Sequence, residues 1–86
     1  MNLLVTTEAQ HYIFLKGGNA RAKLEHPSLQ LGRPKESEVK EYKEVQLNDH
    51  VKIYVHLSLL SLDDSYQLKI DLKRGLLGKR LVLTGI

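Results

Sequence analysis

The chain contains no cysteine at all. This absence excludes disulfide bonds, thiolate metal ligands and cysteine nucleophiles together. Because small secreted domains commonly depend on disulfide bonds, we expect a protein of the cytoplasm. The chain also lacks any apolar run near the roughly 18 residues that span a membrane. Its first residues lack the basic flank and the apolar length of a signal peptide, so we expect no membrane partner.

Motifs of the common enzyme classes are missing as well. No nucleophile elbow, phosphate-binding loop or dinucleotide fingerprint occurs. The adjacent carboxylates Asp63 and Asp64 precede a serine, a composition that is typical of a turn. The spacing of the four histidines matches no zinc motif, whether at His11, His26, His50 or His56. We therefore expect a protein that is not an enzyme and that has no metal site and no cofactor.

The composition indicates one small folded domain over residues 1–86. Hydrophobic residues make up 42% of the chain and charged residues 27%, which are ordinary values for a globular domain. Leucine is the exception, because it occupies 17 of the 86 positions. So much leucine predicts either a well-filled core or a second apolar face that requires a partner.

The C-terminal half has a clear period of two. Apolar and polar side chains alternate over residues 50–59 and again over residues 66–73, as in half-buried strands. The short polar segment between the two runs predicts an antiparallel hairpin. A third strand is expected over residues 79–84, after the two glycines that break the pattern. The side chains expected on the shared buried side are Val51, Ile53, Val55, Leu57, Leu68, Ile70 and Leu72.

The N-terminal half is less clearly patterned. Residues 11–16 are predicted as a strand that pairs with residues 20–25, with a short helix that ends before Gly17 as the alternative. Residues 36–46 fit a short amphipathic helix and a polar edge strand equally well. We therefore predict an all-β fold, a small barrel or a curled antiparallel sheet with at most one short helix.

A basic cluster lies near the C-terminal end, where five cations are opposed by Asp71 alone. A basic surface on a β framework attracts the phosphate backbone of nucleic acids. The alternative is an edge strand that its lysines protect from aggregation. The candidate nucleic-acid contacts in this cluster are Lys69, Lys73, Arg74, Lys79 and Arg80.

Two further features predict contacts with partners. Tyr54 lies on the polar face of its strand, where its ring is a candidate for stacking on a base, with flat packing on the sheet as the alternative. Leu60 and Leu62 continue the apolar run past the alternating segment, so a regular strand cannot turn all of its leucines toward one core. We therefore predict a homodimer with Leu60 or Leu62 at its interface.

Several short motifs occur in a recognisable order. Gly32-Arg33-Pro34 precedes an acidic segment, the strand 51–57 follows, and then Tyr66-Gln67-Leu68. The final stretch over residues 76–83 has a glycine followed by Arg-Leu-x-Leu. This order resembles that of the small single-stranded-DNA-binding proteins of filamentous phages. The resemblance implies an OB-type barrel, a dimer, and a viral protein that acts in the host cytoplasm.

The same resemblance implies roles for individual residues. It makes Arg33, Lys79 and Arg80 contacts to the nucleic-acid backbone and Tyr54 the stacking residue. We therefore predict a non-enzymatic protein that binds nucleic acid, preferring single strands, through a basic β face. The alternative is a small protein-interaction module, an inhibitor or an assembly subunit, that uses its leucine-rich face.

Overall fold

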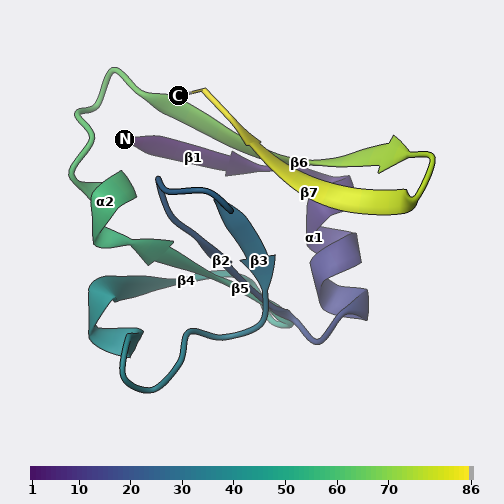
Figure 1. Cartoon of the computed structure of the whole chain (residues 1–86), viewed down its shortest axis with the longest axis horizontal. Helices are drawn as coiled ribbons and strands as arrows, with labels where there is room; N and C mark the ends of the chain where they lie inside the picture. Colours follow the sequence, from purple (N-terminus) through teal and green to yellow (C-terminus); the bar gives the residue numbers. More distant parts are fainter. Residues whose placement is uncertain (86) are drawn as a thin grey trace.

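The computed structural model describes residues 1–85 and contains two β-sheets (Figure 1). In chain order the elements are β1 (Asn2–Val5), α1 (Thr7–Leu15), β2 (Asn19–Ala22), β3 (Leu29–Leu31), the 3-10 helix η1 (Val39–Glu41), β4 (Tyr42–Asn48), β5 (Val51–His56), α2 (Leu57–Leu60), β6 (Gln67–Gly75) and β7 (Gly78–Thr84).

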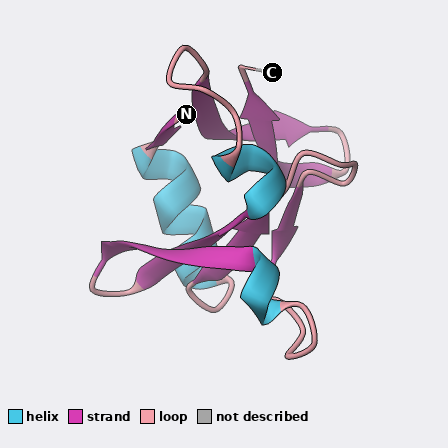
Figure 2. Cartoon of the chain, turned by 90° about the vertical axis from the view of Figure 1, so that its left-hand side faces the viewer, coloured by secondary structure: helices cyan, strands magenta, loops and turns pink. Residues whose placement is uncertain are grey.

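Both sheets are mixed. The first has the strand order β1-β6-β7, with β1 parallel to β6 and β7 antiparallel to β6. The second has the order β3-β2-β5-β4, in which only β2 and β5 run parallel. The side view in Figure 2 shows that strands make up most of the molecule and that its helical segments are short. The prediction of a mostly β protein is confirmed, with curled sheets in place of a closed barrel among the described strands.

One hydrophobic core joins the helix α1 to both sheets. Ala9 and Ile13 of α1 are fully buried, and α1 contacts β6 of the first sheet and β2 and β5 of the second. The remaining buried members of this core are Val5, Ala20, Ala22, Val51, Ile53, Val55, Leu59, Leu68 and Ile70. The two sheets therefore share one core, which α1 covers at one end (Figure 1).

The segment predicted as a strand over residues 11–16 belongs to helix α1, so that prediction is wrong. Thr6 is the N-cap, and its hydroxyl accepts a hydrogen bond from the amide of Ala9 at 3.2 Å. Ala9 and Ile13 are spaced by four residues and supply the buried stripe. The helix ends before Gly17 and Gly18, whose φ values of 111° and 85° are ones that glycine adopts readily. Capping and burial thus outweigh the strand preference of the aromatic and β-branched residues.

The strand predicted over residues 50–59 ends early. The ring Nδ1 of His56 accepts a hydrogen bond from the amide of Ser58 at 2.9 Å and so caps the helical turn α2. Leu59 is 1% exposed, whereas Leu57 is 54% exposed, which contradicts the prediction that Leu57 is buried. The other predicted core residues are buried, except Leu72, which is half-buried.

The predicted hairpin between residues 51 and 73 does not form. Strand β5 pairs with β2 and β4, whereas β6 pairs with β1 and β7, so the two strands belong to different sheets. The third predicted strand is confirmed as β7. Of the two alternatives for residues 36–46, the edge strand is confirmed as β4, and the amphipathic helix is reduced to the three-residue 3-10 turn η1 before it. Within residues 1–85, no helix is long and apolar enough to cross a membrane.

Candidate nucleic-acid interface

Four residues of the predicted basic cluster lie next to the turn of the β6–β7 hairpin. The strand register places Lys73 directly opposite Arg80, and Arg74 directly opposite Lys79. Residues directly opposite each other in an antiparallel pair lie on the same face, so each face of the hairpin carries one pair of like charges. We call these four residues the basic pairs. Like charges directly opposite each other are unfavourable for the pairing of the two strands.

The basic pairs have no acidic partner in the described part of the chain. No carboxylate of residues 1–85 forms an ion pair with any of them. All four side chains belong to exposed residues. They therefore remain free to neutralise an anionic partner.

Lys69, the fifth predicted contact, is in a different position. Its ammonium lies 3.8 Å from the carboxylate of Asp71. Asp71 also accepts hydrogen bonds from the amide of Leu72 at 2.8 Å and from the hydroxyl of Thr6 at 3.0 Å. The Leu72 amide and then the Thr6 hydroxyl lower the pKa of Asp71, so this carboxylate stays charged beside Lys69. Lys69 is thus partly neutralised by an ion pair, whereas Lys73 acts on the same carboxylate through its charge without forming an ion pair.

Helix α1 adds two residues beside the hairpin that the sequence did not point to. The hydroxyl of Tyr12 lies 3.5 Å from the carbonyl oxygen of Lys79. The ammonium of Lys16 lies 5.7 Å from the centroid of the Tyr12 ring. This contact places a sixth cation near the hairpin, and a tertiary contact of this kind leaves no local signal in the sequence.

Arg33, in the segment after β3, contacts Tyr54 of strand β5 in the second sheet. The guanidinium Nε of Arg33 donates a hydrogen bond to the hydroxyl of Tyr54 at 3.1 Å. Tyr54 is only 4% exposed, so its ring has no free face on which a base can stack, and the stacking prediction does not agree with the structure. The segment that follows β3 covers this ring, with Arg33 and Pro34 beside it.

Arg33 itself is exposed, but it is surrounded by other charges. The ammonium of Lys52 lies 2.8 Å from the carboxylate of Glu44 and lowers its pKa through a hydrogen bond and its charge. The charge of Arg33 lowers the pKa of Glu44 to a smaller extent. No hydrogen bond or ion pair within residues 1–85 connects Arg33 to the β6–β7 hairpin. The resemblance to phage proteins implied that Arg33 binds the nucleic-acid backbone together with Lys79 and Arg80. The hydrogen bonds of Arg33 do not place it beside these two residues.

The predicted interface residues Leu60 and Leu62 are half-buried and pack against the core of their own chain. The helical turn α2 makes this possible, because it redirects the leucines that a regular strand would have turned outward. The argument for a homodimer at Leu60 or Leu62 therefore loses its premise. The exposed leucines lie elsewhere, and the most exposed are Leu76 and Leu77 in the β6–β7 turn.

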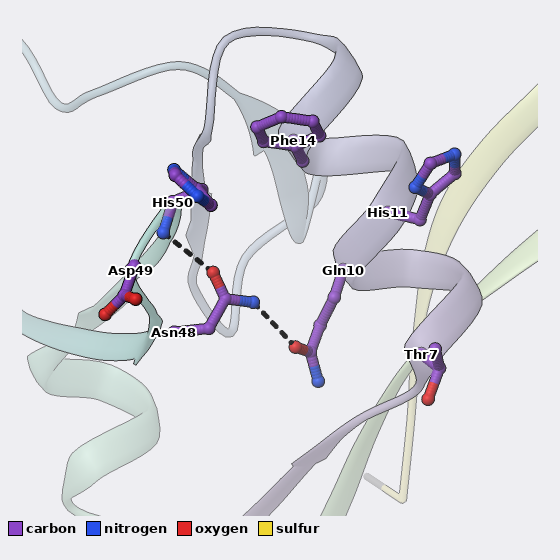
Figure 3. A pocket seen from close by; sticks show the side chains of 7 residues that line it. All are labelled: Thr7, Gln10, His11, Phe14, Asn48, Asp49 and His50. Atoms are coloured by element: carbon purple, nitrogen blue, oxygen red, sulfur yellow. Dashed lines mark hydrogen bonds between the residues drawn. The ribbon is translucent and has the colours of Figure 1, made fainter.

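A hollow of about 350 Å³ lies between α1 and the turn that joins β4 to β5 (Figure 3). The side chain of Asn48 bridges its two sides, donating to Gln10 at 3.1 Å and accepting from the amide of His50 at 2.8 Å. Figure 3 shows that His11 projects to the other side of the helix from His50. No group of three or more potential metal ligands occurs in residues 1–85. The hollow thus lacks the convergent charged groups of a metal site.

A family model for the CC/Se motif containing family matches residues 1–86, and the chain belongs to this family. The family description names a CC/Se motif, whereas these 86 residues contain no cysteine. No curated protein and no solved structure matches the chain. The comparisons thus establish the family of the chain and indicate no activity for it.

Proposed function

We propose that this member of the CC/Se motif containing family is a non-enzymatic nucleic-acid-binding protein that prefers single strands. The basic β6–β7 hairpin is the binding element, with Lys73, Arg74, Lys79 and Arg80 on the phosphates. A nucleic-acid partner is consistent with a cytoplasmic protein, or with the host cytoplasm if the source is viral.

The observation that carries this proposal is the register of the hairpin. Two like-charge pairs lie directly across the strands from each other, and none of the four residues has an acidic partner in residues 1–85. An edge that only needs protection from aggregation gains it from isolated lysines, without two repulsive pairs in succession. Phosphate groups on both sides of the hairpin remove the repulsion, because each face then has its own anions.

A preference for single strands follows from the size of the element. A hairpin carrying four cations gives few phosphate contacts, and a flexible strand can wrap around both of its faces. A rigid duplex presents its phosphates along fixed lines. Tyr54 is left out of the proposed interface, and Lys16 is added to it because of its position beside Tyr12.

The test is a fluorescence titration with labelled single-stranded and double-stranded oligonucleotides at low salt. The variant Lys79→Gln/Arg80→Gln removes one cation from each basic pair. It should weaken binding to every sequence alike, since phosphate contacts do not read bases. The matched control Lys35→Gln/Lys40→Gln removes the same charge at exposed positions outside the hairpin and should bind nearly as the parent does. Equal binding by parent, variant and control would contradict the proposal.

The second candidate is a protein-interaction module, and one observation favours it. Phe14 and Leu15 are both exposed at the end of α1, and Phe14 packs beside His50 with ring centroids 5.3 Å apart. This apolar site replaces the one predicted at Leu60 and Leu62. Sedimentation of the parent and of a Phe14→Ser/Leu15→Ser variant at high micromolar concentration tests it, because a homodimer formed here dissociates in the variant.

A further inference from the structure

The turn of the β6–β7 hairpin carries two leucines whose side chains are fully exposed. Leu76 and Leu77 are 106% and 105% exposed, so their side chains pack against nothing in the chain. Figure 1 shows the turn at the outer end of the hairpin, beyond helix α1. Turns usually carry polar residues, because their side chains remain in water. Two fully exposed apolar side chains therefore indicate a contact made outside the chain.

The cations lie immediately behind the leucines on both strands. Gly75 pairs with Gly78 at the turn, and the two basic pairs follow. At about 3.3 Å per residue, the charges begin roughly 7 Å behind the tip of the hairpin. A group that meets the leucines thus meets positive charge on both faces of the hairpin directly afterwards.

We propose that Leu76 and Leu77 form a wedge that inserts between neighbouring bases of a single strand, while the basic pairs hold the flanking phosphates. This inference rests on the proposed nucleic-acid function and specifies its base contact. In duplex DNA, architectural proteins insert apolar side chains such as leucine between base steps and partly unstack them, and the inference extends this contact to a single strand. Tyr54 belongs to the other sheet and is buried, and within the β6–β7 hairpin the exposed large apolar side chains are Leu76 and Leu77.

Two other occupants fit the tip less well. A second copy of this chain would have to meet the hairpin with a different surface, since two basic hairpins repel, and such head-to-tail contacts do not close into a dimer. An anionic lipid surface would meet the same leucines and cations, but it would not use the contact of the basic pairs with nucleic-acid phosphates on which this inference rests. In the base-step arrangement, the cations on opposite faces of the hairpin lie where the phosphates on either side of an inserted wedge would lie.

The experiment uses an oligonucleotide that contains 2-aminopurine, whose fluorescence rises when the base is unstacked. We expect the parent to raise this fluorescence on binding. The variant Leu76→Ser/Leu77→Ser should bind about 10- to 100-fold more weakly, as expected for lost apolar burial, and should leave the fluorescence low. Its salt dependence should equal that of the parent, because the leucines carry no charge.

The matched control is Leu4→Ser/Leu57→Ser, which changes two leucines that are exposed outside the hairpin. This control should bind and unstack as the parent does. Both double variants should unfold at nearly the temperature of the parent, since the four side chains are largely exposed.

The outcomes separate the wedge from the function on which it rests. If the parent binds with the predicted salt dependence but the leucine variant binds and unstacks equally well, the wedge is wrong and the proposed function remains. If the parent binds no oligonucleotide, the proposed function fails and the wedge fails with it. If the leucine variant loses only binding to vesicles of phosphatidylcholine with phosphatidylserine, the tip contacts lipid and the wedge is overturned.

Discussion

Truncation of Leu59 tests the end of strand β5 and the start of α2. A strand that continued through residue 59 would place Leu57 and Leu59 on the same buried face. The structure separates them, because Leu59 is 1% exposed and Leu57 is 54% exposed. Leu59→Ala should therefore lower the free energy of unfolding by about 2–5 kcal/mol, through lost burial and the cavity that remains. Leu57→Ala should change it by less than about 0.5 kcal/mol.

The loss at Leu59 is large for so small a protein. A chain of 86 residues is expected to have a total stability of about 4–13 kcal/mol, so one buried leucine contributes a substantial fraction. The assay is urea unfolding followed by circular dichroism, with the midpoint and slope fitted for the parent and both variants. Equal losses at Leu57 and Leu59 would mean that the strand continues and that the helical turn is wrong.

Three further predictions concern the turn after α1, the anchored carboxylate and the hairpin. Gly18→Ala should destabilise the fold more than Gly17→Ala, which thermal unfolding of both variants measures. An added Cβ at residue 18 would lie 2.5 Å from the carbonyl oxygen of His50, whereas a Cβ at residue 17 would meet open space. The folded-state pKa of Asp71 lies below its unfolded value of 3.8, so the stability it contributes is present above that pH and is lost as the pH falls through the folded pKa. Asp71→Asn should therefore flatten the loss of stability in acid unfolding below about pH 4, and an unchanged acid profile would refute the anchoring role. Lys79→Thr/Arg80→Thr should raise the unfolding temperature, because it removes the repulsion across the hairpin, and a lower unfolding temperature would show that the basic pairs help folding.

The sequence was sufficient where a local pattern determines the structure. The alternation over residues 66–73 and the glycines after it predicted β6 and β7. The charge cluster predicted that this hairpin is basic, but the register distributes its cations over both faces in place of the single basic face expected. The sequence was insufficient for the partner strands. Alternation predicts a half-buried strand but does not say which neighbour it pairs with, so β5 and β6 were wrongly joined.

The remaining differences arise from contacts between distant residues and from an unusual cap. Tyr54 is buried because the segment after β3, about twenty residues earlier, folds over it and Arg33 bonds its hydroxyl. No feature around Tyr54 indicates this cover. Histidine is not among the preferred N-cap residues, so the helical turn that starts after His56 was also missed. That turn decides the environment of Leu60 and Leu62.

The dependence of oligonucleotide binding on salt tests the central claim most directly. Four phosphate contacts made by the basic pairs predict that the logarithm of the affinity for a single strand falls with the logarithm of salt with a slope near −2.8, at about −0.7 per contact. Lys79→Gln/Arg80→Gln should flatten this slope by about 1.4, and Lys35→Gln/Lys40→Gln should leave it unchanged. A parent whose affinity is independent of salt, or a hairpin variant with the full slope, would contradict the assignment of the β6–β7 hairpin as a nucleic-acid interface.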